Sequence, residues 1–228
     1  MGGMGGRGAT ELPPPFDDSD DVLQLTGKTF KQVGREARGS TVYLVNFYVN
    51  DDAASREFAE AYKKAARALK GMAVVAAIDC ARYPKVMNAM EVDTFPTVKL
   101  LTPDGSQDME GRLSAKRLVE AAKEALPSFV TSFAMSGASG VTRAVARITR
   151  WMADDDKDDG GAAGAAVLVT NQNLVSPMYK ALSGSLHGKL PFAQITVPDG
   201  AAHAEALSEL RSLFPGQSFG DGDGDGSD

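Results

Sequence analysis

Cysteine is nearly absent from this chain of 228 residues, which contains one, Cys80. A single thiol can form neither an intramolecular disulfide nor a Cys-x-x-Cys redox pair. Histidine is also scarce, and His187 and His203 together with Cys80 provide too few ligands for a structural zinc site. The sequence therefore predicts no metal and no cofactor.

Long apolar runs are missing as well. No stretch of about 18 apolar residues occurs, so the sequence predicts no transmembrane helix. The first 15 residues, MGGMGGRGATELPPP, lack the apolar segment of a secretory signal. If the chain is complete as given, these features predict a cytoplasmic location.

The chain has fewer basic than acidic residues, with a net charge of −6, and the charges are unevenly distributed along it. Residues 22–127 contain 16 Lys and Arg against 13 Asp and Glu, so the excess of acid lies outside this segment. Acidic runs at residues 17–21, 154–159 and 221–228 are typical of solvated linkers and tails. Because the positive excess of residues 22–127 is small and forms no basic stripe, we expect no nucleic-acid partner.

The chain begins with glycine, proline and aspartate without apolar periodicity, which predicts a disordered leader over residues 1–20. Strand-like and helix-like patterns then alternate over residues 21–127. The run TVYLVNFYV at residues 41–49 is apolar on both faces, as is typical of a central strand covered by helices. We expect strands at residues 22–25, 41–49, 72–78, 97–102 and 107–110, with helices between and after them. This pattern predicts an α/β domain.

A second, shorter cycle follows over residues 128–215. We expect strands at residues 128–133, 165–170 and 191–197, and helices at residues 141–152, 176–186 and 201–213. The same order of elements in both cycles indicates an internal duplication of fold. Residues 216–228 follow as an acidic glycine and aspartate tail.

Several separate motifs of residues 21–127 resemble a thioredoxin-fold catalytic domain of the protein disulfide isomerase family. They are LVNFYVNDDAAS at 44–55, EAYKKAARALKG at 60–71, VVAAIDC at 74–80 and VDTFPTVKLLTPDG at 92–105. The resemblance implies a three-layer α/β/α thioredoxin fold with a mixed central sheet. Residues 165–197 resemble, more weakly, the non-catalytic thioredoxin-like domains of the same family. The chain is thus expected to be a tandem of thioredoxin folds whose second copy is incomplete.

The resemblance also shows where this chain departs from its family. The two redox cysteines of the family fall at Asp52 and Ser55, and the buried acid that assists proton transfer falls at Asn46. Thiol-disulfide exchange requires a thiolate that attacks sulfur, which neither position provides. We therefore expect a redox-inactive protein that is not an enzyme, in which Asp51 and Asp52 cap the following helix.

Cys80 matches a cysteine that is common at a strand end in this family, away from the redox positions. We expect it to pack as a small apolar residue. The alternative is an accessory thiol-disulfide oxidoreductase, in which Cys80 reacts together with a cysteine of a partner protein. The accessibility of Cys80 distinguishes the two.

Pro96 occupies the position of the family's cis-proline, which helps to bind extended peptides. The resemblance implies a peptide-binding groove formed by Thr94, Phe95 and Pro96, with Asp51, Asp52 and Gly111 at its rim. The corresponding function is a chaperone or scaffold for unfolded polypeptides or partner proteins. A third interpretation is a structural subunit of a larger assembly.

The resemblance also has implications for the partners of the chain, its compartment and its second copy. The glycine-rich start of the chain is similar to linkers that follow J-domains in co-chaperones fused to thioredoxin-like domains, which implies an Hsp70 and J-domain system as partner. The family implies the lumen of the endoplasmic reticulum. For the incomplete second copy two alternatives remain: a half-fold covered by another chain, or a fragment of a longer protein. In either case its unpaired strand edge invites the addition of a strand.

Overall fold

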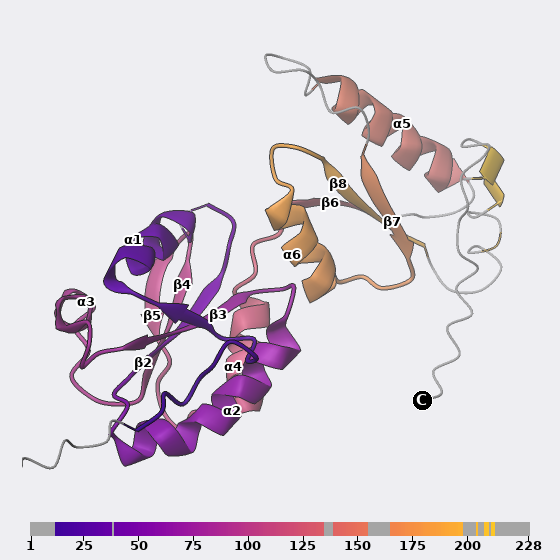
Figure 1. The fold of residues 1–228 in the computed structure, drawn as a ribbon. Helices are drawn as coiled ribbons and strands as arrows, with labels where there is room; N and C mark the ends of the chain where they lie inside the picture. The colour runs from indigo at the N-terminus through magenta and orange to yellow at the C-terminus, as the bar shows by residue number, and fades with distance from the viewer. Residues whose placement is uncertain are drawn as a thin grey trace, which may run out of the picture. The chain divides into compact units, whose positions relative to one another are not determined.

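The structure, a computed structural model, describes residues 12–37, 39–134, 139–154 and 165–197, and positions 204, 208, 209, 211 and 212. The chain divides into two compact units, Met1–Pro127 and Ser128–Asp228, shown in Figure 1. The predicted tail of residues 216–228 and nearly all of the acidic segment at residues 154–159 lie outside the described residues.

The first unit is built around a five-stranded sheet in the order β1-β3-β2-β4-β5. Strands β1 and β2 are parallel to β3, whereas β4 is antiparallel to both β2 and β5, so the sheet is mixed. Helices α1 and α3 contact each other, as do α2 and α4. The elements are β1 (Leu23–Leu25), α1 (Gly27–Glu36), β2 (Tyr43–Tyr48), α2 (Ala53–Leu69), β3 (Val74–Asp79), α3 (Pro84–Ala89), β4 (Thr97–Thr102), β5 (Gly105–Asp108) and α4 (Ala115–Glu124). This order and these directions confirm the expected thioredoxin fold.

Strand β2 lies at the centre of this sheet, as its apolar sequence predicts. All six of its residues are buried, and it pairs with β3 on one edge and with β4 on the other. Strand β5 begins two residues earlier than predicted, because Thr102 pairs directly with Gly105 across a two-residue turn. Gly105 has a φ of 133°, which a residue with a side chain rarely adopts.

The N-terminal residues 12–20 pack against the first unit, so the predicted disordered leader is wrong for this segment. Phe16 is fully buried, and its ring meets Tyr48 and Tyr62 edge-on at centroid distances of 5.4 and 5.8 Å. Asp20 forms an ion pair with Lys63 of α2 at 3.1 Å. The charge and proline content of the segment predict disorder, but its one aromatic residue, Phe16, is buried and holds the segment against the domain.

The second unit contains a three-stranded parallel sheet in the order β6-β8-β7. Its elements are β6 (Val130–Ala134), α5 (Ser139–Asp154), β7 (Ala166–Thr170), α6 (Pro177–Ser185) and β8 (Phe192–Thr196). Phe133, Ala144, Ala193, Ile195 and Val197 form its buried core. Positions 204, 208, 209, 211 and 212 of the predicted final helix are helical, and the rest of it lies outside the described residues.

A tyrosine hydroxyl shows how the two units correspond. In the first unit the hydroxyl of Tyr62 on α2 lies 2.8 Å from the carbonyl oxygen of Leu44 on β2 and 2.7 Å from that of Ala76 on β3. In the second unit the hydroxyl of Tyr179 on α6 lies 3.0 Å from the carbonyl oxygen of Ala166 on β7 and 2.9 Å from that of Ala193 on β8. Strand β7 therefore corresponds to β2, β8 to β3 and α6 to α2. Within the described residues the second unit has no counterpart of β4, β5 or α4, and its sheet is partial.

We predict that Phe16→Ala lowers the free energy of unfolding of the first unit by about 3–5 kcal/mol, because it leaves a cavity between Tyr48 and Tyr62. Amide hydrogen exchange of β2, read by mass spectrometry, measures this loss within the first unit alone. Leu12→Ala, at an exposed side chain of the same segment, should change the free energy of unfolding by no more than about 0.5 kcal/mol. Equal effects of the two substitutions would show that Phe16 is not the anchor.

Candidate functional site

The pairing of strands brings the predicted site residues to one edge of the first sheet. Phe47, near the end of β2, pairs with Thr97 at the start of β4. The backbone N–H of Met109, just after β5, donates to the carbonyl oxygen of Val98 at 2.9 Å. The segments that continue from these three strands therefore lie at the same edge. We call Asp51, Asp52, Thr94, Phe95, Pro96 and Gly111, which these segments carry, the candidate edge.

Asp52 begins helix α2 at this edge. Its backbone is extended, and its Oδ2 accepts a hydrogen bond from the backbone N–H of Ser55 at 2.7 Å. This geometry satisfies one of the N–H groups that the first helical turn leaves without a partner. The predicted capping role is confirmed for Asp52. It is wrong for Asp51, which is exposed and lies one residue before the cap.

Ser55 is fully buried in the first turn of α2. Its Oγ accepts a hydrogen bond from the backbone N–H of Val49, with 3.4 Å between Oγ and the nitrogen. The two positions where the family carries redox cysteines therefore hold a capping carboxylate and a buried hydroxyl. Both groups stabilise the turn between β2 and α2, and neither can form a mixed disulfide.

Residues 94–96 form the neighbouring part of the candidate edge. The Phe95–Pro96 peptide bond is cis, as the resemblance to the family implies. The side chain of Thr97 donates to the carbonyl oxygen of Thr94 at 2.8 Å, while the Thr94 side chain is exposed. Phe95 packs partly against the core, and Pro96 is half-buried. The Thr94 side chain is therefore open to solvent, while Phe95 and Pro96 hold the segment against the domain.

Gly111 lies beyond β5 and has a φ of 76°. This conformation favours glycine, and a Cβ here would come within 3.2 Å of Nη1 of Arg117. Gly111 is exposed, and its role at the rim of a peptide-binding groove stays a prediction. The candidate edge is therefore assembled from three segments that are distant in sequence.

Cys80 follows β3 and packs into the core, with 2% of its surface exposed. Its backbone N–H donates to the carbonyl oxygen of Tyr48 at 2.8 Å. Burial, followed by the nearby carboxylate of Asp79, raises the pKa of the Cys80 thiol to about 12. Reactive cysteines have the opposite features, a lowered pKa and partial exposure. The environment of Cys80 thus favours packing over thiol chemistry.

Asn46, at the position of the family's buried acid, is fully buried on β2. Among the described residues, neither its Oδ1 nor its Nδ2 has a hydrogen-bond partner. A carboxamide does not ionise in the physiological pH range, so it cannot act as the acid or base that a carboxyl group provides. The strand therefore keeps a polar group at this depth but has no group there that could relay a proton.

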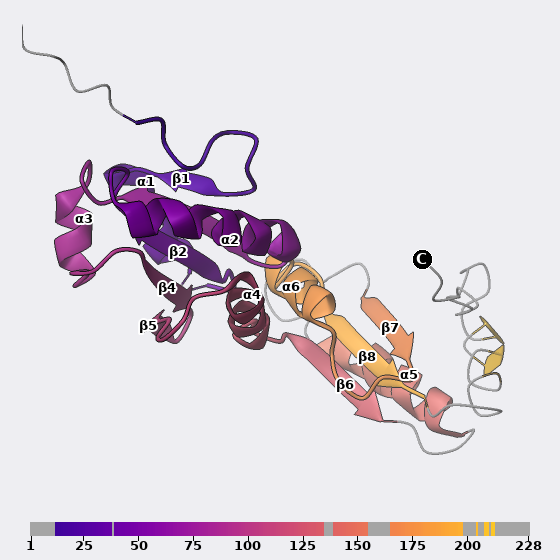
Figure 2. The same cartoon turned by 90° about the horizontal axis from the view of Figure 1, so that it is seen from below.

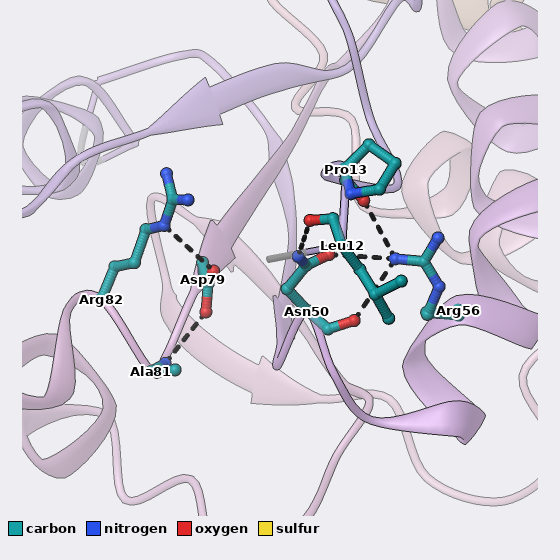
Figure 3. A network of polar contacts seen from close by, with 7 residues as sticks. All are labelled: Leu12, Pro13, Asn50, Arg56, Asp79, Ala81 and Arg82. Carbon is teal, nitrogen blue, oxygen red and sulfur yellow. Dashed lines mark hydrogen bonds and ion pairs between the residues drawn. The ribbon is translucent and has the colours of Figure 1, made fainter. Parts of the chain in front are cut away.

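A polar network joins the N-terminal segment to the start of α2, as Figure 3 shows. Nδ2 of Asn50 donates to the carbonyl oxygen of Leu12 at 2.6 Å. Nη1 of Arg56 donates to the carbonyl oxygen of Pro13 at 3.0 Å and to Oδ1 of Asn50 at 3.1 Å. No sequence motif predicts these contacts, and Phe16 after the proline run is the one signal that could have indicated them.

A second polar group in Figure 3 lies at the end of β3. Oδ1 of Asp79 accepts from the backbone N–H of Ala81 at 3.0 Å, and Oδ2 lies 3.6 Å from Nε of Arg82. Asp79 therefore stabilises the turn after β3. In the described part of the chain no cluster of three or more His, Cys, Asp or Glu side chains could hold a metal ion. In the same residues no helix is long and apolar enough to cross a membrane.

We predict that an alkylating reagent at pH 8 modifies Cys80 in the folded protein at least about a hundredfold more slowly than in urea, because each unit of raised pKa lowers the thiolate fraction about tenfold. Mass spectrometry of the labelled chain measures both rates. Because Cys80 is the only cysteine, no other thiol contributes. Similar rates in the two conditions would support the alternative of an accessory thiol.

Comparisons with known proteins agree with this fold. The family model described as Thioredoxin matches residues 21–124. Protein disulfide-isomerase A6 of Mesocricetus auratus is 30% identical over 127 residues, which are 55% of this chain and 28% of that protein. DnaJ homolog subfamily C member 10 of Xenopus laevis is 28% identical over 98 residues, which are 42% of this chain and 12% of that protein.

A solved structure of ERdj5 (form II) matches 86% of this chain and 24% of its own chain, with a TM-score of 0.51 and 16% identity. This likeness shows the fold alone. The chain spans between 12% and 28% of the length of these relatives. The family model, the identities and the observed topology agree: residues 21–124 form a thioredoxin domain, and this domain is similar in sequence to protein disulfide isomerases.

Proposed function

We propose that the first unit is a redox-inactive thioredoxin domain that binds extended polypeptide segments and acts as a chaperone or scaffold in protein folding. One observation carries the proposal. The helix cap Asp52 and the buried hydroxyl of Ser55 occupy the two redox positions, while the single thiol of Cys80 is buried elsewhere in the fold. The family has a role in protein folding or thiol-disulfide exchange, and the first of these roles needs no thiol.

The candidate edge supports the binding part of the proposal. In relatives, the segment before the cis-proline forms backbone hydrogen bonds with an extended peptide, as in strand addition. Here that segment keeps the cis bond at Pro96 and an exposed Thr94. Gly111 leaves the rim without a side chain. A peptide could therefore reach the backbone of residues 94–96 although the thiols are missing.

Partners and compartment are part of the same proposal. One similar protein is described as a DnaJ homolog, which supports an Hsp70 and J-domain system as partner. Similarity to protein disulfide isomerases supports the lumen of the endoplasmic reticulum as compartment. The thiol alternative, in which Cys80 acts with a partner cysteine, requires exposure that the packed Cys80 does not have.

We predict that the protein does not accelerate the reduction of insulin by dithiothreitol, because no thiolate is available at the start of α2. The double substitution Asp52→Cys and Ser55→Cys places two thiols at these positions and should create measurable reductase activity. Turbidity of precipitating insulin is the measurement. Activity of the unaltered chain that Cys80→Ser abolishes would contradict the redox-inactive assignment.

We predict that Thr94→Arg weakens the binding of a reduced and alkylated unfolded protein by about tenfold, equivalent to ~1.4 kcal/mol, because a long charged side chain obstructs the candidate edge. Fluorescence anisotropy of the labelled unfolded protein measures the dissociation constant. Ser106→Arg is the matched control, since Ser106 is exposed on β5 and pairs with Leu101 toward the opposite end of β4. Unchanged affinity in Thr94→Arg would place the binding surface elsewhere.

A further inference from the structure

Helix α4 and strand β5 form the two walls of a groove in the first unit, and both are labelled in Figure 2. Strand β5 is the edge strand of its sheet, and all four of its residues are exposed. The groove has a volume of about 890 Å³ and is lined on the helix side by Arg117, Glu120 and Glu124. Leu100 of β4 also lines it. Every lining residue belongs to the described part of the first unit.

The groove begins at the candidate edge. Gly111 belongs to that edge, and a Cβ on it would lie 3.2 Å from Nη1 of Arg117, which lines the groove. Glu110, directly before Gly111, lines the groove as well. Strand β5 then leads back along the groove to Asp104, in the turn that precedes the strand. A polypeptide that binds at the candidate edge and continues past Gly111 therefore reaches the groove.

Acidic side chains dominate the groove. Five carboxylates line it, against one basic side chain, that of Arg117. Asp108 is paired with Lys99, and Glu120 lies 3.9 Å from Lys116 in an exposed pair of little strength. The other three carboxylates form no ion pair with any described residue: Asp104, Glu110 and Glu124. The groove therefore carries negative charge that the domain does not compensate.

The sign of this charge limits what the groove can hold. Nucleic acid and other polyanions are repelled. The acidic runs of the chain itself, at residues 17–21, 154–159 and 221–228, carry the same sign as the groove. A polypeptide segment with basic side chains is complementary to it.

The spacing of the helix carboxylates suits an extended segment. Glu120 and Glu124 are four residues apart on α4, so their Cβ atoms lie about 6 Å from each other. Side chains on one face of an extended chain are two residues apart, which is a distance of ~7 Å. Successive carboxylates of α4 thus lie opposite alternate residues of a segment that runs along the helix. The long, flexible side chains of lysine and arginine adapt to the remaining difference.

We propose that the groove binds the continuation of a polypeptide held at the candidate edge, and that it selects segments with lysine or arginine at alternate positions. The inference rests on the proposed function, because it names the class of polypeptide that the candidate edge takes. Exposed ion pairs each contribute little, so a few of them give a preference of about fivefold over an uncharged segment.

The test uses three fluorescein-labelled peptides of equal length. All share an uncharged half rich in valine and threonine, which favours an extended chain. The other half carries two lysines, two glutamates or two serines at alternate positions. Fluorescence anisotropy with the full chain measures each dissociation constant. We expect the lysine peptide to bind about fivefold more tightly than the serine peptide, and the glutamate peptide to bind most weakly. In 1 M NaCl, where charges are screened beyond ~3 Å, the preference for lysine should fall below twofold.

The double substitution Glu110→Gln and Glu124→Gln should reduce the preference for lysine to less than twofold, because it removes two uncompensated charges from the groove. Asp18→Asn with Glu60→Gln is the matched control. It removes the same charge from two exposed side chains that do not line the groove, and should keep the preference.

Each contrary outcome has its own meaning. If the lysine and serine peptides bind equally and Thr94→Arg weakens both, the selection by the groove is overturned while the proposed function stands. If none of the peptides binds, the proposed function and this inference fail together. A preference that persists in the Glu110 and Glu124 double variant, or that the control variant also loses, overturns the groove as its source.

Discussion

The enclosure of β2 is the constraint on which the first unit depends. Two strands pair with its edges, and all its side chains are buried. This is possible because helices α1 and α3 lie on one face of the sheet and α2 and α4 on the other (Figures 1 and 2). The hydroxyl of Tyr62 then ties α2 to the backbone of β2 and β3. This arrangement sets the geometry of the candidate edge, because only four residues separate the end of β2 from the start of α2. The second unit repeats the tyrosine but leaves the matching strand half enclosed.

The fold could be predicted from local signals that agree with one another. The apolar run of β2 and the helix cap at Asp52 are local signals, because each acts within a few residues of its own position. The start of β5 was displaced by two residues, because the two-residue turn before Gly105, rather than the strand's own composition, sets the pairing. Phe16 was missed for a related reason. Its partners Tyr48 and Tyr62 lie more than 30 residues away, and no periodicity reports such contacts.

Those parts of the candidate site that depend only on a residue's place in a motif could be predicted from the sequence. Motif spacing located Asp52, Ser55 and Pro96, and strand register brings their segments to one edge. Which of two adjacent aspartates forms the cap depends on where the helix begins, so Asp51 was assigned a role that only Asp52 has. The packing of Cys80 likewise depends on its surroundings in three dimensions. At the two positions where the family carries redox cysteines, this chain has a helix cap, Asp52, and a buried serine, Ser55.

The hydrogen bond from Asn50 to Leu12 links two parts of the first unit that are 38 residues apart in sequence. It meets the chain two residues before the Asp52 cap, and Arg56 of the same helix start contacts Pro13. The turn between β2 and α2 is thus held from outside by the segment that the buried Phe16 anchors. Loss of that segment would therefore remove hydrogen-bond partners from the helix start as well as an aromatic ring from the core.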